Sequence, residues 1–183
     1  MVPLIRARLL AVFSAIVLLL PNGTGARPNP MRGEPLSAGP PASSGPLAIV
    51  VNRSNPLDGV TSAELRRIFL GSRTYWPNGR RITILMREPG DLERDFVLRE
   101  VCGMTEQQFK THFLHGLYTG EILVSPKILD TSGGVKKFIF NVPGAVGYVR
   151  LEEVDDTVKV LRIDERLPSE KGYRLQIPGQ AEN

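Results

Sequence analysis

Short apolar runs alternate with stretches of helical spacing from Leu47 onward. Leu47–Val51 is a continuous apolar run bounded by Pro46 and Asn52, which is typical of a buried strand. The loop after it carries two turn signals, Asn55-Pro56 and Asp58-Gly59. The same reasoning predicts three further strands, at Ile82–Met86, Ala145–Val149 and Val158–Ile163.

Four stretches between these strands have capping residues followed by apolar residues at helical spacing. Thr61 and Glu64 form a capping-box pattern, Leu65, Ile68 and Phe69 share one face, and Gly71 ends the helix. A second helix is predicted from Asp91 to Gly103, with Leu92, Phe96 and Val97 as its apolar residues. A third starts at Thr105 and carries Phe109, His112 and Phe113 on one face. A fourth follows Thr131-Ser132-Gly133-Gly134, continues through Phe140 and is closed by Pro143-Gly144.

Strands that alternate with helices indicate an α/β fold, with a mostly parallel sheet flanked by helices. The sequence contains no internal repeat, so we expect a single domain built around this sheet.

The first residues have the pattern of a secretory signal. Met1–Arg8 carries two arginines and no acid, and Leu9–Leu20 is apolar except for Ser14. A bilayer-spanning helix needs about 20 apolar residues, so this run is short for an anchor. Small residues at Thr24 and Ala26 predict cleavage after Ala26, which makes residues 1–26 a signal peptide and the protein periplasmic or secreted. An uncleaved N-terminal anchor is the alternative.

Two polar segments flank the predicted domain. Twelve of the twenty residues in 27–46 are Pro, Gly or Ser, which predicts a linker, either a tether or a disordered end left by processing. Residues 165–183 read as a polar tail, so the predicted folded domain is 47–164.

Composition excludes several classes of protein. The chain has 183 residues, of which 42% are hydrophobic, enough for one globular domain. One cysteine allows no internal disulfide, and no Cys/His cluster has zinc spacing. Without Arg6 and Arg8 of the predicted signal, 21 basic side chains stand against 19 acidic ones, so no nucleic-acid partner is expected.

Two loop-to-helix corners could bind an anion. Arg87 follows a strand and is followed by Gly90 and Asp91 at a helix start, a place where open α/β sheets hold ligands. Ser132, Gly133 and Gly134 form the second corner, with Lys136 and Lys137 in the next turn. Ordinary helix capping explains either corner equally well, and the charges of Asp91 and Glu93 oppose an anion at the first.

Other reactive or exposed side chains have structural interpretations. His112 and His115 are three residues apart but lack further metal ligands at fixed spacing, so we expect packing and surface roles. Cys102 ends a helix and reads as a small buried hydrophobe. Trp76 and Tyr75 are the candidates for a protein-binding patch, although core packing is the expectation for Trp76. We expect no cofactor and no catalytic activity, because no paired acid and base is visible.

Several of these segments occur together, in order, in a known family. They are Ile49–Pro56, Ala63–Gly71, Trp76–Gly79, Arg87, Phe96 and Pro143–Tyr148. With them, residues 47–164 resemble the phosphate-binding, PstS-like substrate-binding proteins of bacterial ABC importers, as a single-lobe short form.

The resemblance implies a lobe of the type 2 periplasmic-binding-protein fold that presents phosphate or another small oxyanion to an ABC permease. It gives Arg87 an oxyanion-pairing role. The family's loop reads Arg, two residues, Gly and then Ser-Gly-Thr, whereas Asp91 and Glu93 follow Gly90 here. Carboxylates only accept hydrogen bonds and carry the wrong charge, so binding is expected to be weak.

A second class of function is compatible with the same residues. Family receptors clamp phosphate between two lobes, and this chain has residues for about one. A lobe that has lost its ligand would act as a protein–protein interaction module that docks an envelope protein or a permease. A homodimer that rebuilds a two-lobed cleft lies between the two interpretations.

Overall fold

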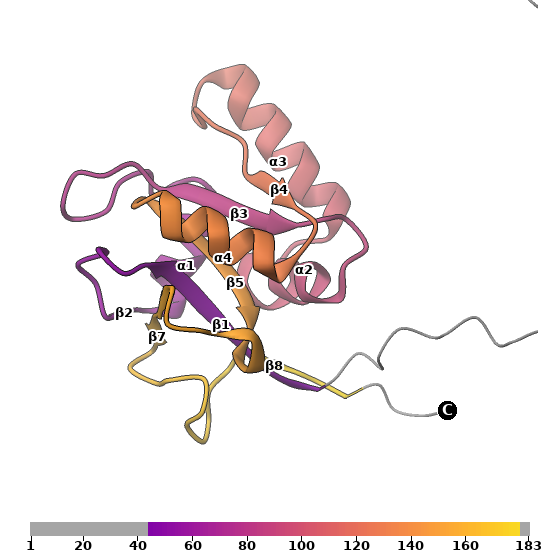
Figure 1. The fold of residues 1–183 in the computed structure, drawn as a ribbon. Helices are drawn as coiled ribbons and strands as arrows, with labels where there is room; N and C mark the ends of the chain where they lie inside the picture. Colours follow the sequence, from indigo (N-terminus) through magenta and orange to yellow (C-terminus); the bar gives the residue numbers. More distant parts are fainter. Residues whose placement is uncertain (1–43, 180–183) are drawn as a thin grey trace, which may run out of the picture. The chain divides into compact units, whose positions relative to one another are not determined.

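The structure is a computed structural model that describes residues 44–179 (Figure 1). The predicted signal peptide (1–26) and residues 27–43 of the predicted linker lie outside the described residues.

Within residues 44–179, six strands form the central sheet, in the order β4-β3-β5-β1-β6 with β8 paired to β1. Two further short strands, β2 and β7, pair with each other in parallel. The strands are β1 (Gly45–Asn52), β2 (Gly59–Val60), β3 (Thr83–Arg87), β4 (Lys127–Leu129), β5 (Ala145–Arg150), β6 (Val158–Val160), β7 (Arg162–Ile163) and β8 (Gln176–Ile177).

The α/β class with helices flanking the sheet is confirmed, and the sheet is mixed in its strand directions. β3 is parallel to both β4 and β5. β1 runs antiparallel to β5, β6 and β8. β5 and β6 lie on either side of β1, and the chain between them contains only a short 3-10 turn, η2 (Leu151–Glu153).

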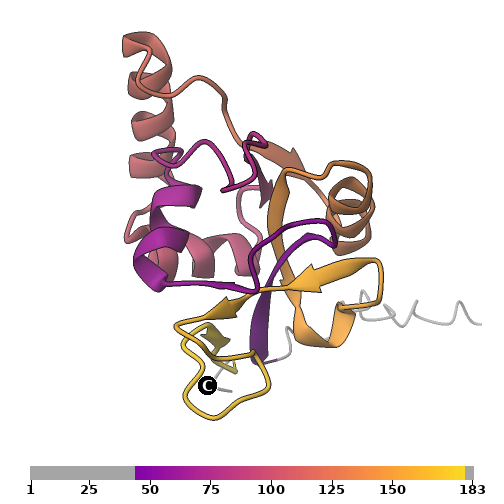
Figure 2. The ribbon, with the colours of Figure 1, turned by 90° about the vertical axis from the view of Figure 1, so that its left-hand side faces the viewer.

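Helices cover both faces of the sheet, as the two views show (Figures 1 and 2). α4 packs on β5 and β1 from one side, while α1 and α2 lie on the opposite side. α2 continues into a π-helical turn, η1, which ends at Gly103 in a left-handed conformation. The helices are α1 (Ser62–Phe69), α2 (Leu92–Val97), η1 (Leu98–Cys102), α3 (Glu106–Thr119) and α4 (Ser132–Asn141).

The continuous apolar run of β1 follows from burial on both faces. Leu47, Ile49 and Val51 point into the larger apolar cluster, which contains side chains of α1 and α2. Ala48 and Val50 point the other way, into the cluster beneath α4. A strand covered on both faces has no exposed side on which polar residues would alternate.

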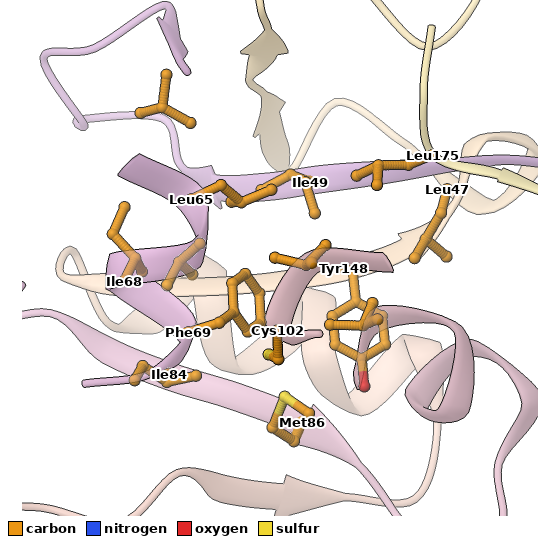
Figure 3. Close-up of a cluster of buried hydrophobic side chains, with 14 of the residues drawn as sticks. Leu47, Ile49, Leu65, Ile68, Phe69, Ile84, Met86, Cys102, Tyr148 and Leu175 are labelled. Carbon is orange, nitrogen blue, oxygen red and sulfur yellow. The ribbon is translucent and has the colours of Figure 1, made fainter. Parts of the chain in front are cut away.

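The larger cluster joins the sheet to the helices beside it (Figure 3). Leu65, Ile68 and Phe69 of α1 are all at most 1% exposed, as their spacing predicted. The capping box of Thr61 and Glu64 is present, as is a second one formed by Thr105 and Gln108.

The folded domain extends past both predicted boundaries. β1 already starts at Gly45, which pairs with Ile177 of β8. The stretch read as a polar tail places Tyr173, Leu175 and Ile177 in the core, each at most 5% exposed. The Tyr173 hydroxyl also donates to the carbonyl of Leu47 at 2.9 Å. The alternation of these three apolar residues is a strand signal that average polarity conceals.

Trp76 packs into the core, as expected. Its side chain is 2% exposed and its indole Nε1 donates to the carbonyl of Gly144 at 3.0 Å. That bond ties the Trp76–Gly79 turn to the turn before β5. Tyr75 next to it is 54% exposed.

A two-residue hairpin near the C-terminus supplies a test of this fold. Asp164 and Glu165 both have positive φ, at 49° and 66°, between Ile163 and Arg166, whose backbones bond to each other. Glycine relieves the steric cost of this conformation, so Glu165→Gly should raise the free energy of unfolding by about 0.5–1 kcal/mol in urea denaturation.

Asp164→Gly is the matched control. The Asp164 carboxylate accepts hydrogen bonds from the backbone N–H and the hydroxyl of Ser62, at the start of α1. Its loss should cancel the gain from the relieved backbone. A less stable Glu165→Gly protein would contradict the hairpin geometry.

Candidate functional site

The candidate site lies where two neighbouring strands end. β3 and β5 are parallel, so their last residues, Arg87 and Arg150, reach the same edge of the sheet. α2 follows β3 after a short turn and places Asp91 and Glu93 at that edge. We call Arg87, Asp91, Glu93 and Arg150 the arginine corner.

Arg87 is held by the two carboxylates that follow it. Its Nη2 and Nε lie 2.9 and 3.2 Å from Oδ2 of Asp91, and its Nε lies 3.6 Å from Oε2 of Glu93. The side chain is 14% exposed. Its third nitrogen, Nη1, is buried and has no hydrogen-bond partner within residues 44–179.

Arg150 joins the same group from β5. Its Nε donates to Oε1 of Glu93 at 2.6 Å, so both guanidinium groups contact one carboxylate. The backbone N–H of Arg150 bonds to Oε2 of Glu153 at 3.3 Å, and Oε1 of Glu153 accepts from the Ser132 hydroxyl at 2.6 Å. A continuous set of polar contacts therefore connects the arginine corner to the start of α4.

Two buried side chains fix the position of Arg87. Arg94, 3% exposed, donates to the carbonyl of Arg87 at 2.7 Å and pairs with Glu106 of α3 at 2.7 and 3.0 Å. The hydroxyl of Tyr148 accepts the Arg87 backbone N–H at 3.0 Å. Burial raises the pKa of Tyr148, so the hydroxyl keeps its proton. Side chains of β5 and α2 thus hold both backbone polar groups of Arg87 at the end of β3.

The pKa values of the two carboxyl groups of the corner are shifted in opposite directions. Burial raises the pKa of Glu93, and the adjacent Asp91 carboxyl raises it further, against the effect of Arg150. Burial also opposes the ionisation of Asp91, but hydrogen bonding with Glu93 and Arg87 outweighs it and holds the pKa of Asp91 below its ordinary value. Glu93 is therefore the member of the pair that protonates first as the pH falls.

Helix-start amides at both predicted corners bond to side chains of the chain itself. Oδ1 of Asp91 accepts the backbone N–H groups of Glu93 and Arg94. The Thr131 hydroxyl accepts the N–H of Gly134 at 3.1 Å. Capping, which the sequence left as the equal alternative, is thus present at both places.

The structure brings the predicted site residues into two groups. Arg87 and Asp91 contact each other, and Gly90 forms the turn between them with φ of +88°. Ser132, Gly133 and Gly134 open α4, where Ser132 bonds to Glu153 and Gly133 is exposed. Of the two lysines that follow, Lys136 pairs with Asp155 and with the carbonyl of Glu153, and Lys137 is exposed.

Sequence reasoning missed Arg150, Glu153 and Arg94. Arg150 follows the apolar run Ala145–Val149 as Arg87 follows Ile82–Met86, and two arginines at the ends of parallel neighbours are a readable signal. Arg94 bonds to Arg87 and Glu106, 7 and 12 positions away, and Glu153 bonds to Arg150 and Ser132, 3 and 21 positions away. None of these spacings forms a motif that marks a binding site.

The residues considered for metal or thiol chemistry lie elsewhere. His112 bonds to the carbonyl of Leu70 at 2.9 Å, and His115 is exposed on α3. No group of three or more potential metal-binding side chains occurs in the part of the chain that the structure describes. Cys102 is buried, and burial raises the pKa of its thiol to about 12, which confirms its packing role. Within residues 44–179, no helix has the length and apolar character to span a bilayer.

Solved structures show the same fold. A protein described as a phosphate ABC transporter substrate-binding protein from Clostridium perfringens, with bound phosphate, is 23% identical with a TM-score of 0.62 and covers 74% of this chain. An ABC-type phosphate transport receptor from Vibrio cholerae is 21% identical, with a TM-score of 0.55, and covers 69% of this chain. PstS from Borrelia burgdorferi is 11% identical, with a TM-score of 0.58, and covers 74% of this chain. The matches span 54%, 49% and 55% of those proteins, so this chain corresponds to about half of their length.

The sequence model of one family, described as the PBP superfamily domain, matches residues 40–180. That range includes β1 and the C-terminal β8, in agreement with the folded domain. The resemblance noted from the sequence is thereby confirmed, and the chain belongs to the PBP superfamily domain family.

Proposed function

We propose that the domain is a non-enzymatic substrate-binding lobe that binds phosphate or another small oxyanion at the arginine corner. The observation that carries the proposal is the meeting of Arg87 and Arg150 at one sheet edge, with Nη1 of Arg87 buried and unpartnered among the described residues. A buried guanidinium donor without a partner is costly, and an oxyanion supplies the missing acceptor.

The chemistry of the corner suits an oxyanion. Guanidinium groups present planar, paired donors that match the oxygens of phosphate or sulfate. The edge at the carboxyl ends of parallel strands is also where open α/β sheets bind ligands. The solved structures described as phosphate receptors support phosphate as the first candidate.

Affinity in the wild-type protein is expected to be low. Asp91 and Glu93 balance the two arginines when both are ionised, so the corner attracts an anion only weakly. A single lobe also leaves its ligand open to water, which weakens every polar contact to it.

A whole receptor would need a second lobe, because the chain matches about half of its solved counterparts. Any second lobe of the same fold would provide it, whether it is a further domain, a second copy or a separate chain. We assign the receptor to the phosphate import pathway of an ABC transporter, with the permease as partner. The N-terminal signal pattern supports a periplasmic or secreted location.

A protein-docking role is the second candidate, and one observation favours it. Leu114, Leu117 and Tyr118 lie at positions i, i+3 and i+4 of α3 and are 72%, 39% and 91% exposed. Apolar side chains gathered on a helix face in water mark interaction surfaces. This face, rather than Trp76, is where an envelope protein or permease would bind.

Calorimetric titration with phosphate at low salt tests the binding role. Arg87→Ala removes the central charged donor and should weaken phosphate binding about 10- to 100-fold, the scale of a charge-assisted hydrogen bond. Arg99→Ala is the matched control: it removes the same charge from a side chain that is 63% exposed and pairs with Glu100 on the surface. It should bind like the wild type.

Equal binding by Arg87→Ala and the wild type would show that the site is not at this corner. If neither the wild type nor the variants bind phosphate, sulfate or other oxyanions, the docking role takes precedence.

Replacement of both acidic residues should have the opposite effect. Asp91→Ser with Glu93→Thr removes two negative charges beside Arg87 and restores hydroxyl donors, while Ser still caps α2. Phosphate affinity should rise about tenfold or more at neutral pH. An unchanged dissociation constant would mean that the carboxylates do not oppose the ligand.

A further inference from the structure

We propose that Asp91 and Glu93 are an internal competitor for the oxyanion, so that ligand binding at the arginine corner is coupled to the uptake of one proton by this carboxyl pair. Binding is then favoured by acid. This inference rests on the proposed function, because it describes the regulation of the same site.

The contacts define the competition. Asp91 accepts from Nε and Nη2 of Arg87, which are donors that an oxyanion would use. Glu93 bridges the two guanidinium groups, 2.6 Å from Nε of Arg150 and 3.6 Å from Nε of Arg87. A ligand that contacts both arginines must therefore share or replace the oxygens of Glu93.

Charge counting gives the coupling its direction. With both carboxyls ionised, the four side chains of the corner have no net charge. One proton on the pair leaves a charge of +1, which a singly charged oxyanion neutralises. A protonated carboxyl also becomes a hydrogen-bond donor toward the ligand.

Within residues 44–179, the other charged and titratable groups next to the pair come from the strands and from α2. From the strands these are Arg87, Arg150 and the protonated Tyr148, and from α2 Arg94, whose charge is balanced by Glu106 of α3. Glu153 of η2 contacts the backbone of Arg150, and Lys136 of α4 bonds to the Glu153 carbonyl. Both histidines of the chain lie on α3, and the contact described for His112 is to Leu70, so neither contacts the corner within the described residues.

The pKa shifts of the two carboxyl groups agree with binding that is favoured by acid. The pKa of Glu93 is raised, first by burial and then by Asp91, so Glu93 is the member of the pair that takes up the proton first as the pH falls. The pKa of Asp91 is lowered, so it stays ionised and keeps capping α2.

The test is calorimetric titration with sulfate between pH 5 and pH 7.5. Sulfate remains a dianion throughout this range, whereas phosphate itself changes protonation, so any pH dependence reports the protein. The wild type should bind more tightly as the pH falls, by up to about tenfold per pH unit for one coupled proton. Two buffers with different protonation enthalpies should report the uptake of close to one proton per sulfate at the upper end of the range.

Two variants separate the pair from other acids. Glu93→Gln keeps an acceptor for Arg150 but cannot ionise, so its affinity should be nearly independent of pH and at pH 7.5 should exceed that of the wild type. Glu100→Gln is the matched control, because Glu100 lies on η1, is 44% exposed and pairs with Arg99. It should retain the full pH dependence.

The free energy of unfolding tests the protonation of Glu93 without any ligand. A carboxyl with a raised pKa contributes stability below its ordinary value of about 4.5, and the contribution is lost as the pH rises through the folded value. The wild type should therefore lose stability relative to Glu93→Gln in urea unfolding as the pH rises from 4.5 to 7.

The outcomes distinguish the two proposals. If sulfate binds with the same affinity at every pH, or if Glu93→Gln keeps the pH dependence of the wild type, the proposed competition by Asp91 and Glu93 is wrong. The proposed oxyanion site itself would still be supported by the binding. If neither wild type nor Glu93→Gln binds sulfate or phosphate at any pH, the proposed function itself is wrong.

Discussion

The parallel pairing of β3 with β5 determines where the chemistry of this domain lies. Thr83 and Ile84 are in register with Ala145 and Val146, so both strands end at one edge and carry Arg87 and Arg150 there. The pairing is secured by burial on both faces, with Ile84, Met86, Val146 and Tyr148 in one apolar cluster and Leu85, Ala145 and Val149 in the other. The inferred ligand site depends on this register, because a one-residue slip of either strand would turn the arginine of that strand to the other face of the sheet.

Two guanidinium groups at a half-buried edge need anions nearby, and the chain supplies its own. Asp91 and Glu93 meet the arginines, and Glu153 extends the contacts to α4. These carboxylates balance the two positive charges without a ligand, although Nη1 of Arg87 still lacks an acceptor among the described residues. Carboxylates beside arginines that face the ligand edge link a binding site to proton concentration, whereas hydroxyl donors in the same place would not.

The sequence predicted the local structure well and the boundaries less well. The shared face of Leu65, Ile68 and Phe69, the capping box of Thr61 and Glu64 and the burial of Trp76 and Cys102 follow from short-range patterns, and all are confirmed. The direction of β1 and the place of β8 depend on pairings between residues about 95 to 132 positions apart, which no local pattern encodes. Within the candidate site, Arg87 and Asp91 were identified, but the bridge from Glu93 to Arg150 joins residues 57 positions apart and required the fold.

The most direct measurement of the central claim is arginine side-chain NMR during a phosphate titration at mildly acidic pH. The Nε–Hε signals of Arg87 and Arg150 should shift together and saturate with one dissociation constant, while the exposed Arg99 signal stays in place. Saturable shifts confined to arginines elsewhere, or no saturable shift at Arg87 and Arg150, would contradict an oxyanion site at the arginine corner.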